Sequence, residues 1–358
     1  MNMISLCMIV KNEGENLRDC LYKVSAIVDE IIVVDTGSTD NTRSIAAEFT
    51  DKVYGYNWCY DFAAARNFSI SKASNDWILV LDADEYVSNY MQEKVYNFVN
   101  DISNEKVVGR IERINLLEDS GASRKFTERI SRLFNRKYLQ YEGTIHEQIV
   151  GKDGKAYNTV SVDITIDHIG YTKEVINKTN KLKRNMDMLI RAIEDKPNDP
   201  YLYFQLGKTY YMMKDFNASC VYFEKALTFK LESRLEYVED LIETYGYALI
   251  NSGKYTDAMK IENYLDIYIN SADFHFLLGL IYMNNAKFNQ AVESFLECTK
   301  FPHSKVEGIT TYSSYYNIGV IYDVLGYREK AIEYYSMCGG YEPARNRLTS
   351  KGDSKIKQ

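Results

Sequence analysis

A short apolar segment that ends in two aspartates constrains the fold of this chain more than any other feature. Ile78 to Leu81 are four consecutive apolar residues, the pattern of a strand that is covered on both faces, as in the parallel sheet of an α/β domain. Asp82 and Asp84 follow at once, separated by Ala83, and alternation along an extended chain places both carboxylates on one side. Because ligands of such sheets bind at the carboxyl ends of the strands, we expect a binding site here.

The two carboxylates suit a divalent cation. Hard oxygen ligands favour Mg²⁺ or Mn²⁺, with phosphate oxygens and water completing the octahedron. An Asp-x-Asp without context is more often a solvated turn, and the apolar strand before it favours a site instead. The choice depends on whether other parts of the chain complete that site.

The first fifty residues alternate between strand and helix patterns. Met3 to Val10 is an apolar run, and apolar residues then recur at helical spacing from Leu17 to Val24. A second strand, Glu30 to Asp35, leads into Thr36 to Asn41, whose glycine and capping residues open another helix. This rhythm predicts a parallel, Rossmann-like sheet with its loops at the carboxyl edge.

Three polar residues near this edge are candidates for contacts with a nucleotide. Glu13 and Asp35 can accept hydrogen bonds from a ribose hydroxyl or from an imide N–H. Arg66 has two interpretations of equal weight. Its guanidinium binds a diphosphate, or it pairs with Asp61 or Asp82 and holds the loop.

The remainder of the first half predicts further helices and strands. The expected elements are a helix over Asp61–Ile70, a helix from about Ser88 to Asp101, strands near Val107–Asn115, Ile130–Phe134 and Val160–Ile166, and a hairpin turn at Lys152–Gly154. Two of the four histidines, His146 and His168, stand next to acidic residues at strand ends. This clustering favours a site, and the alternative for each is a core histidine with satisfied hydrogen bonds.

Five segments in this order resemble family 2 glycosyltransferases of the GT-A fold. They are Met8–Glu13, Ile32–Asp40, Ala65–Asn67, Leu81–Asp84 and Gly143–Glu147. The resemblance covers roughly residues 1 to 172. It implies transfer of a sugar from a nucleotide diphosphate, usually UDP, with inversion at the anomeric carbon and with Mn²⁺ or Mg²⁺ as cofactor.

The resemblance also implies roles for individual residues. Those implied for binding of the UDP-sugar are Val10, Asn12, Glu13, Asp35, Arg66, Asp82 and Ala83, with Asp35 at the uridine and Asp82 at the ribose or the donor sugar. Asp84 and His168 are implied as metal ligands, and we expect Asp167 to orient His168. Glu147 takes the place of the catalytic base, with His146 beside it, since a carboxylate can accept the proton of an acceptor hydroxyl or thiol.

The second half of the sequence repeats itself. Similar patterns of aromatic and small residues begin at Leu206-Gly207, Tyr245-Gly246, Leu278-Gly279 and Ile318-Gly319, and the glycines stand 39, 33 and 40 residues apart. This resembles the tetratricopeptide repeat, a helix pair of about 34 residues, and the longer intervals imply longer loops or helices. The expected division is a transferase domain at 1–172, a linking helix at 173–198, repeats at 199–345 and a tail at 346–358.

The sequence therefore predicts an α/β GT-A domain followed by an all-α solenoid of tetratricopeptide repeats. This arrangement resembles the bacterial sublancin-type peptide S-glycosyltransferases and the flagellin O-glycosyltransferases. The resemblance implies transfer of a hexose or N-acetylhexosamine from a UDP-sugar to a Ser, Thr or Cys side chain of a peptide or protein, which the repeats would bind. The alternatives are an acceptor that is a cell-surface glycan or a lipid-linked sugar, repeats that serve only to form a homodimer, and an inactive transferase domain that acts as a scaffold.

Composition excludes several other classes of protein. The net charge is −7 without a basic block, which argues against a nucleic-acid partner. No apolar run approaches the ~18 residues of a transmembrane helix, and the amino end lacks the pattern of a signal peptide, so we expect a cytoplasmic protein. The six cysteines are scattered, and neither a zinc site nor a disulfide framework is indicated.

Overall fold

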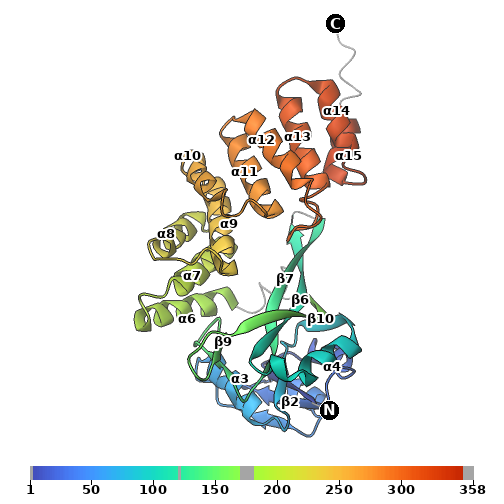
Figure 1. Cartoon of the computed structure of the whole chain (residues 1–358), viewed down its shortest axis with the longest axis vertical. Helices are drawn as coiled ribbons and strands as arrows, with labels where there is room; N and C mark the ends of the chain where they lie inside the picture. The colour runs from blue at the N-terminus through green and yellow to red at the C-terminus, as the bar shows by residue number, and fades with distance from the viewer. Residues whose placement is uncertain (1–2, 120–121, 170–180, 350–358) are drawn as a thin grey trace. The chain divides into compact units, whose positions relative to one another are not determined.

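The computed structural model describes residues 3–119, 122–169 and 181–349. The chain divides into two compact units, Met1–Met188 and Leu189–Gln358 (Figure 1). The division falls inside helix α6 (Lys181–Asp195), within the range of the predicted linking helix. The first part of that predicted helix and residues Gly170 and Tyr171 lie outside the described residues.

An eight-stranded sheet forms the centre of the N-terminal unit, in the order β3-β2-β1-β4-β7-β6-β10-β5. The strands are β1 (Ile4–Val10), β2 (Glu30–Asp35), β3 (Val53–Gly55), β4 (Trp77–Val80), β5 (Glu85–Tyr90), β6 (Val107–Asp119), β7 (Ala122–Asn135) and β10 (Asn158–His168). The first four strands are parallel neighbours, as predicted. The other half is mixed, because β7 is antiparallel to both β4 and β6 and β5 is antiparallel to β10. Only residues 120 and 121 separate β6 from β7, too few for a parallel crossover.

Helices and a small second sheet cover the large sheet. They are α1 (Leu17–Val24), α2 (Thr42–Ala46), α3 (Phe62–Ser71), α4 (Gln92–Asn100), a 3₁₀ turn at Ile102–Asn104, and the antiparallel pair β8 (Leu139–Glu142) and β9 (Gln148–Gly151). Two predictions need correction. Residues 88–90 belong to strand β5, because they pair with β10. The turn at Lys152–Gly154 joins β9 to β10, and these strands pair with other partners, so no hairpin forms there.

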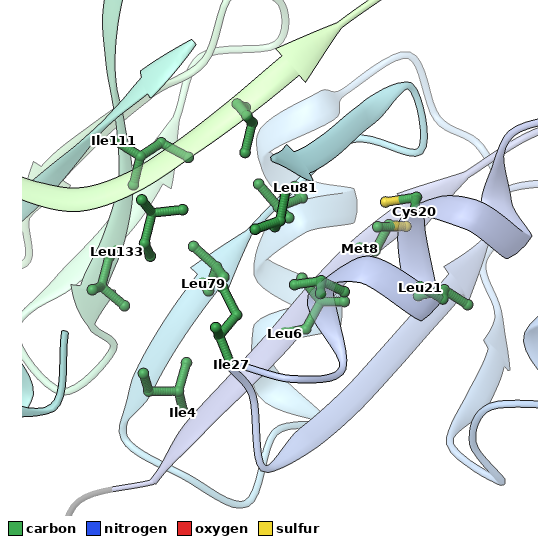
Figure 2. Packing of buried hydrophobic residues seen from close by; sticks show 14 of the residues in the cluster. Ile4, Leu6, Met8, Cys20, Leu21, Ile27, Leu79, Leu81, Ile111 and Leu133 are labelled. Carbon is green, nitrogen blue, oxygen red and sulfur yellow. The ribbon is translucent and has the colours of Figure 1, made fainter. Parts of the chain in front are cut away.

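Side chains of the parallel strands alternate between two hydrophobic cores. In β1, Leu6 and Met8 pack against Cys20 and Leu21 of α1, and Figure 2 shows these residues facing one another. Cys7, between Leu6 and Met8 in sequence, belongs to the core on the other face, which α3 and the small sheet cover. Burial on both faces explains the unbroken apolar runs of β1 and β4.

The C-terminal unit consists of antiparallel helix pairs. Its helices are α7 (Pro200–Met212), α8 (Phe216–Leu227), α9 (Glu236–Asn251), α10 (Tyr255–Ala258), a 3₁₀ helix at Met259–Tyr264, α11 (Ala272–Asn284), α12 (Phe288–Cys298), α13 (Tyr312–Val324), α14 (Arg328–Ser336) and α15 (Glu342–Thr349). The two longer glycine intervals correspond to the connections at 228–235 and 299–311. Both connections lie between one helix pair and the next, so of the two explanations, longer loops account for the longer intervals.

The four repeat glycines allow helices to approach closely. A Cβ atom built on Gly207 would lie 2.5 Å from the ring of Phe223, and one on Gly279 would lie 2.6 Å from the ring of Phe295. Gly319 has the same relation to Tyr335. Gly246 instead meets Leu277 of the next pair, because the second helix of its own pair is reduced to α10 and a 3₁₀ helix.

Two further observations concern the sequence predictions. Within the described residues, no helix combines the length and the apolar character needed to span a membrane. All six cysteines are free thiols, and the five that are buried serve as small core residues.

Candidate active site

The candidate site lies at the carboxyl ends of β1, β2 and β4. The chain runs from β1 to β2 and β3 on one side and then returns to β4 on the other side of β1. This reversal is the topological switch point at which open α/β sheets bind their ligands. The backbone N–H of Thr36 donates to the carbonyl of Val10 at 2.9 Å and joins the first two loops.

Side chains of these two loops hold each other in place. Asn12 adopts a left-handed conformation with φ +55°, and its Oδ1 accepts from the backbone N–H of Thr39 at 2.8 Å. Asp35 is buried, and its Oδ1 accepts from the N–H groups of Gly37 and Ser38, both at 3.1 Å. Asp35 therefore shapes its own loop in this structure.

Glu13 is a partly buried carboxyl at the end of the first loop. Its backbone N–H donates to Oγ1 of Thr42 at 2.8 Å, and its side chain accepts from Asn16 at 3.0 Å. Burial raises the pKa of Glu13, the hydrogen bond from Asn16 opposes this, and the nearby carboxylates Asp84 and Asp82 add to it. Sγ of Cys20 lies 3.6 Å from the carbonyl of Asp82, so the helix that follows the first loop packs beside the Asp-Ala-Asp segment.

Asp82 and Asp84 occupy a turn, which corrects the expectation of an extended strand. The strand β4 ends at Val80, and the N–H of Glu85 donates to the carbonyl of Asp82 at 3.1 Å. Ala83 between them is buried. The two carboxylates consequently have different partners, because the turn removes the alternation on which the prediction rested.

Arg66 on α3 joins Asp82 to Glu147. Its Nη2 donates to Asp82 Oδ1 at 2.9 Å, and its Nε donates to Glu147 Oε1. Arg66 is 6% exposed. Of the interpretations open for Arg66, the structure displays a loop-holding ion pair with Asp82, whereas Asp61 instead caps α3 by accepting from the N–H of Ala64.

A second buried arginine, Arg132 on β7, also holds Asp82. Its Nη2 lies 3.0 Å from Asp82 Oδ2 and 2.7 Å from Oε1 of the fully buried Glu85. Burial alone would raise the pKa of Asp82, but the guanidinium groups of Arg66 and Arg132 outweigh it and hold that pKa far below its usual range. Asp82 is therefore an ionised acceptor.

Asp84 faces His168 across the end of the sheet. Asp84 Oδ2 lies 3.4 Å from Nε2 of His168, and both residues are buried. Burial would raise the pKa of Asp84, and His168 in its protonated form would instead lower it. The expected role of Asp167 is wrong: Nδ1 of His168 lies 2.7 Å from Oδ1 of Asn115, because alternation along β10 directs Asp167 to the other face.

The donor set of Asp84 and His168 fits a divalent cation that keeps other ligands. A carboxylate oxygen and an imidazole nitrogen face one another, and Asn115 already occupies the other ring nitrogen. Among the described residues, no group of three or more His, Cys, Asp or Glu side chains is arranged to hold a metal ion. The pair therefore suits an ion that completes its shell with phosphate oxygens and water, as Mg²⁺ does.

The loop that carries His146 and Glu147 is fixed against α3. Asn67 exchanges two hydrogen bonds with the backbone of Tyr141, at 2.8 and 3.0 Å, and the N–H of Phe62 donates to the carbonyl of Thr144 at 2.9 Å. His146 has a left-handed backbone, φ +50°. Glu147 accepts from Nε of Arg66.

The structure brings Asp82, Asp84, Glu147 and His168 together, and it adds residues that the sequence analysis missed. These are Arg132, Glu85, Asn115, Glu128 and Arg113. Glu85 directly follows the two aspartates, and Asn115 is a polar residue within an apolar strand pattern. Both signals were present in the sequence, but neither indicates a partner without the register of the strands.

Two family models match the two units. Residues 5–160 match the model of glycosyl transferase family 2. Residues 200–232, 272–301 and 312–338 match the tetratricopeptide repeat. The N-terminal unit is therefore a family 2 glycosyltransferase domain, and an array of tetratricopeptide repeats follows it. The predicted fold class is confirmed.

Relatives of this chain are named either for tetratricopeptide repeats or for glycosyltransferase activity. The chain is 35% identical over 216 residues to a TPR repeat-containing protein of Synechococcus elongatus, covering 58% of this chain and 52% of that protein. It is 27% identical over 270 residues to the SPbeta prophage-derived glycosyltransferase SunS of Bacillus subtilis, covering 74% and 62%. It is 32% identical over 169 residues to an uncharacterized glycosyltransferase of Rickettsia felis, covering 44% and 59%. The chain thus spans between half and two thirds of the length of these relatives.

Two solved structures show a partial likeness to this chain. The tetratricopeptide protein YrrB aligns at a TM-score of 0.40 and 22% identity, over 49% of this chain and 87% of that chain. MamA aligns at a TM-score of 0.40 and 17% identity, over 49% and 95%. Likeness at this level supports no conclusion about this chain.

Proposed function

We propose that the protein is an inverting, metal-dependent glycosyltransferase that moves a hexose or an N-acetylhexosamine from a UDP-sugar to a Ser, Thr or Cys side chain of a peptide or protein. The observation that carries the proposal is the arrangement at the end of β4. Asp84 faces His168, and Arg66 joins Asp82 to Glu147.

Donor binding is assigned to the loops at the carboxyl edge. Val10, Asn12, Glu13 and Asp35 line the ends of β1 and β2, where a nucleotide binds in open α/β sheets. Asp82, kept ionised by two arginines, can accept hydrogen bonds from the hydroxyls of the ribose or the donor sugar.

Asp84 and His168 are the residues that would hold Mn²⁺ or Mg²⁺. A cation bound there would act as a Lewis acid and neutralise the charge that develops on the leaving diphosphate. Both side chains are buried and preoriented, so they lose little conformational entropy on binding.

Glu147 is the proposed general base. Transfer forms a bond between the acceptor oxygen or sulfur and the anomeric carbon, breaks the bond from that carbon to the diphosphate, and passes the acceptor proton to a carboxylate. Oε1 of Glu147 is held by Arg66, so Oε2 is the oxygen available to that proton. Arg66 also fixes the carboxylate in orientation, which general-base catalysis requires.

We assign binding of the acceptor to the repeats. Stacked helix pairs of this kind present an extended binding surface, and a polypeptide is the ligand that tetratricopeptide arrays suit best. The relative SunS is named a glycosyltransferase, and the likeness extends over 270 residues, more than the 156 residues of the transferase match. The alignment therefore includes part of the repeat array as well.

The decisive experiment is a panel of UDP-sugars with Mn²⁺, scored for UDP release with and without peptides that bear Cys, Ser or Thr. Release that requires a peptide supports a polypeptide acceptor, and mass spectrometry of the product identifies the sugar and the linked atom. Slow release that is indifferent to every peptide favours a glycan or lipid-linked acceptor instead.

A paired substitution tests the metal ligands. Asp84→Asn should abolish the Mn²⁺-dependent part of UDP binding in calorimetry, because it removes a charged ligand. Asp167→Asn is the matched control, since Asp167 adjoins His168 in sequence but lies on the other face of β10. Equal UDP affinity of the two variants in Mn²⁺ would exclude Asp84 as a ligand.

A further inference from the structure

The imidazole of His168 is held at the nitrogen that faces away from Asp84. Nδ1 lies 2.7 Å from Oδ1 of Asn115, and Nε2 lies 3.4 Å from Oδ2 of Asp84. An amide oxygen can only accept, so neutral His168 donates from Nδ1 and keeps a lone pair on Nε2. This tautomer is the one that a ligand acting through Nε2 requires.

A carboxylate fixes the orientation of the Asn115 amide in turn. Nδ2 of Asn115 donates to Oε1 of Glu128 at 2.7 Å and lies 3.4 Å from the carbonyl of Phe126. Because both of these oxygens only accept, the NH₂ group must face them and the amide oxygen must face His168. Asn115 is fully buried, so bulk water does not compete for either bond.

The register of the strands brings together His168, Asn115 and Glu128, which form a hydrogen-bonded relay. His168 on β10 stands opposite Asn115 on β6, and Arg113 on β6 stands opposite Glu128 on β7. Arg113 donates to Glu128 Oε1 at 2.8 and 3.1 Å and to the buried Glu85 at 3.1 Å. Three neighbouring strands therefore supply consecutive members of one hydrogen-bonded chain.

We propose that Asn115 and Glu128 are positioning residues that fix His168 in the Nδ1–H tautomer and thereby set the affinity of the Asp84–His168 pair for a divalent cation. The assignment of the cation rests on the proposed function. The assignment of the tautomer does not, because it follows from hydrogen-bonding partners within the protein.

The first measurement is the tautomer itself, read from long-range ¹H–¹⁵N spectra of the full chain labelled at histidine and free of metal. His168→Ala identifies the His168 signals. His275 is an internal reference for the opposite tautomer, because its Nε2 lies 2.8 Å from the carbonyl of Ile269 and must donate to it. We expect wild-type His168 to be protonated at Nδ1, and a signal of the Nε2–H form would overturn the proposal.

The second measurement is Mn²⁺ affinity by calorimetry, with and without UDP. Asn115→Leu removes the acceptor at similar volume, and we expect a mixture of tautomers and an affinity about 10 to 100 times weaker. The double variant Asn115→Asp/Glu128→Gln exchanges the carboxylate and the amide. It keeps an acceptor for Nδ1–H and a donor for that acceptor, so it should restore both the Nδ1–H signal and most of the affinity.

The outcomes separate this inference from the proposed function. A folded Asn115→Leu variant with wild-type Mn²⁺ affinity overturns the role of the relay. If Asn115→Leu fails to fold, the exchange variant decides: recovery of the fold without the Nδ1–H signal overturns the proposal, and recovery of both supports it. A wild-type protein that binds no Mn²⁺ in either condition overturns the metal-dependent function and the affinity step, while the spectrum still decides the tautomer.

Discussion

At the scale of single residues, the candidate site is organised by two buried arginines. Arg66 and Arg132 between them hold Asp82, Glu85 and Glu147. A buried ion pair adds little net stability compared with a well-packed apolar pair, but the removal of one partner leaves an uncompensated charge. The geometry of the carboxylates in this site therefore depends on the arginines.

Replacement of Glu147 by glutamine tests the general base. Glu147→Gln keeps the volume and a hydrogen-bond acceptor for Arg66, but an amide oxygen is too weak a base to take the acceptor proton. We expect UDP-sugar binding to stay within a factor of about three and transfer to fall by 10² to 10⁴. Calorimetry and a single-turnover assay measure the two effects separately.

The control for this variant is Glu142→Gln, at the exposed end of β8 in the same region of the chain. It should transfer sugar at the wild-type rate. Normal turnover by Glu147→Gln would place the base elsewhere, with His146 and Glu142 as the next candidates.

Replacement of Arg66 tests its structural role. Arg66→Met leaves the partly buried Glu147 without its counter-ion, and we expect the free energy of unfolding to fall by about 3 kcal/mol. Arg18→Met breaks the exposed pair of Arg18 with Glu48 and should leave the free energy of unfolding nearly unchanged. Urea denaturation followed by tryptophan fluorescence compares the variants, and equal midpoints would contradict the role given to Arg66.

Some residues of the candidate site could be predicted from the sequence, and others could not. The Asp-Ala-Asp segment and His168 stand out in the sequence because charged or titratable side chains follow strand patterns, whereas Glu147 was indicated by the resemblance to family 2 glycosyltransferases. Asn115 and Arg132 do not stand out, because their partners are set by the register of β6, β7 and β10. Register is a property of the folded sheet and is not encoded in the spacing of residues along one strand.

At the scale of elements, local pattern and folded structure agree where the pattern is complete. The apolar runs of β1, β2 and β4 and the helical spacing of α1 and α3 correspond to the observed elements. The segment Glu85–Tyr90 is a strand although we expected part of it to be helical. Its conformation comes from pairing with β10, which is distant in sequence, and tertiary pairing overrides weak local preference.

The repeat glycines give a test of helix packing. An alanine Cβ at position 279 would lie 2.6 to 2.8 Å from ring atoms of the buried Phe295. Overpacking of this kind costs about 1 to 3 kcal/mol and exceeds the ~1 kcal/mol that alanine gains over glycine in a helix. We therefore expect Gly279→Ala to lower the stability of the repeat unit by about 1 kcal/mol, measured by thermal unfolding of the helical circular dichroism.

Two further glycines are controls for this prediction. Gly340→Ala meets no atom within 4 Å and should leave the transition unchanged. Gly246→Ala meets the end of the Leu277 side chain, which can rotate away, so its effect should be smaller than that of Gly279→Ala. A Gly279→Ala protein as stable as the wild type would show that the helix pair adjusts without cost.

At the scale of the whole molecule, the two units can be observed separately. Trp58 and Trp77 are the two tryptophans of the chain, and both lie in the N-terminal unit. Most of the helices belong to the C-terminal unit. Tryptophan fluorescence therefore reports the transferase domain, and helical circular dichroism reports mainly the repeats.

A partly buried ionic cluster in the repeats should give their stability a dependence on pH. Lys305, in the connection between α12 and α13, contacts Glu243, Asp240 and Glu239 of α9 at 3.0, 3.1 and 3.4 Å. Burial raises the pKa of Glu243 to about 8; Lys305 opposes this, and the neighbouring carboxylates add to it. One lysine does not compensate for several carboxylates, so a proton on Glu243 favours the folded state.

The sign of the effect follows from proton linkage. Between the ordinary glutamate pKa and about 8, folded Glu243 binds more protons than unfolded Glu243, so the free energy of unfolding falls as pH rises through this range. We expect the melting temperature of the helical signal to drop from pH 5 to pH 8.5. Glu243→Gln, which is neutral at every pH, should flatten that dependence.

The tryptophan signal provides the matched control in the same samples. The transferase domain has its own pH dependence, because the pKa of Glu13 is also raised by burial, so the comparison depends on the variant and not on the slopes alone. Glu243→Gln should change the pH dependence of the helical transition and leave that of the fluorescence transition as in the wild type. An equal change in both transitions would mean that the two units unfold as one cooperative body, and the repeats would then stabilise the transferase domain directly.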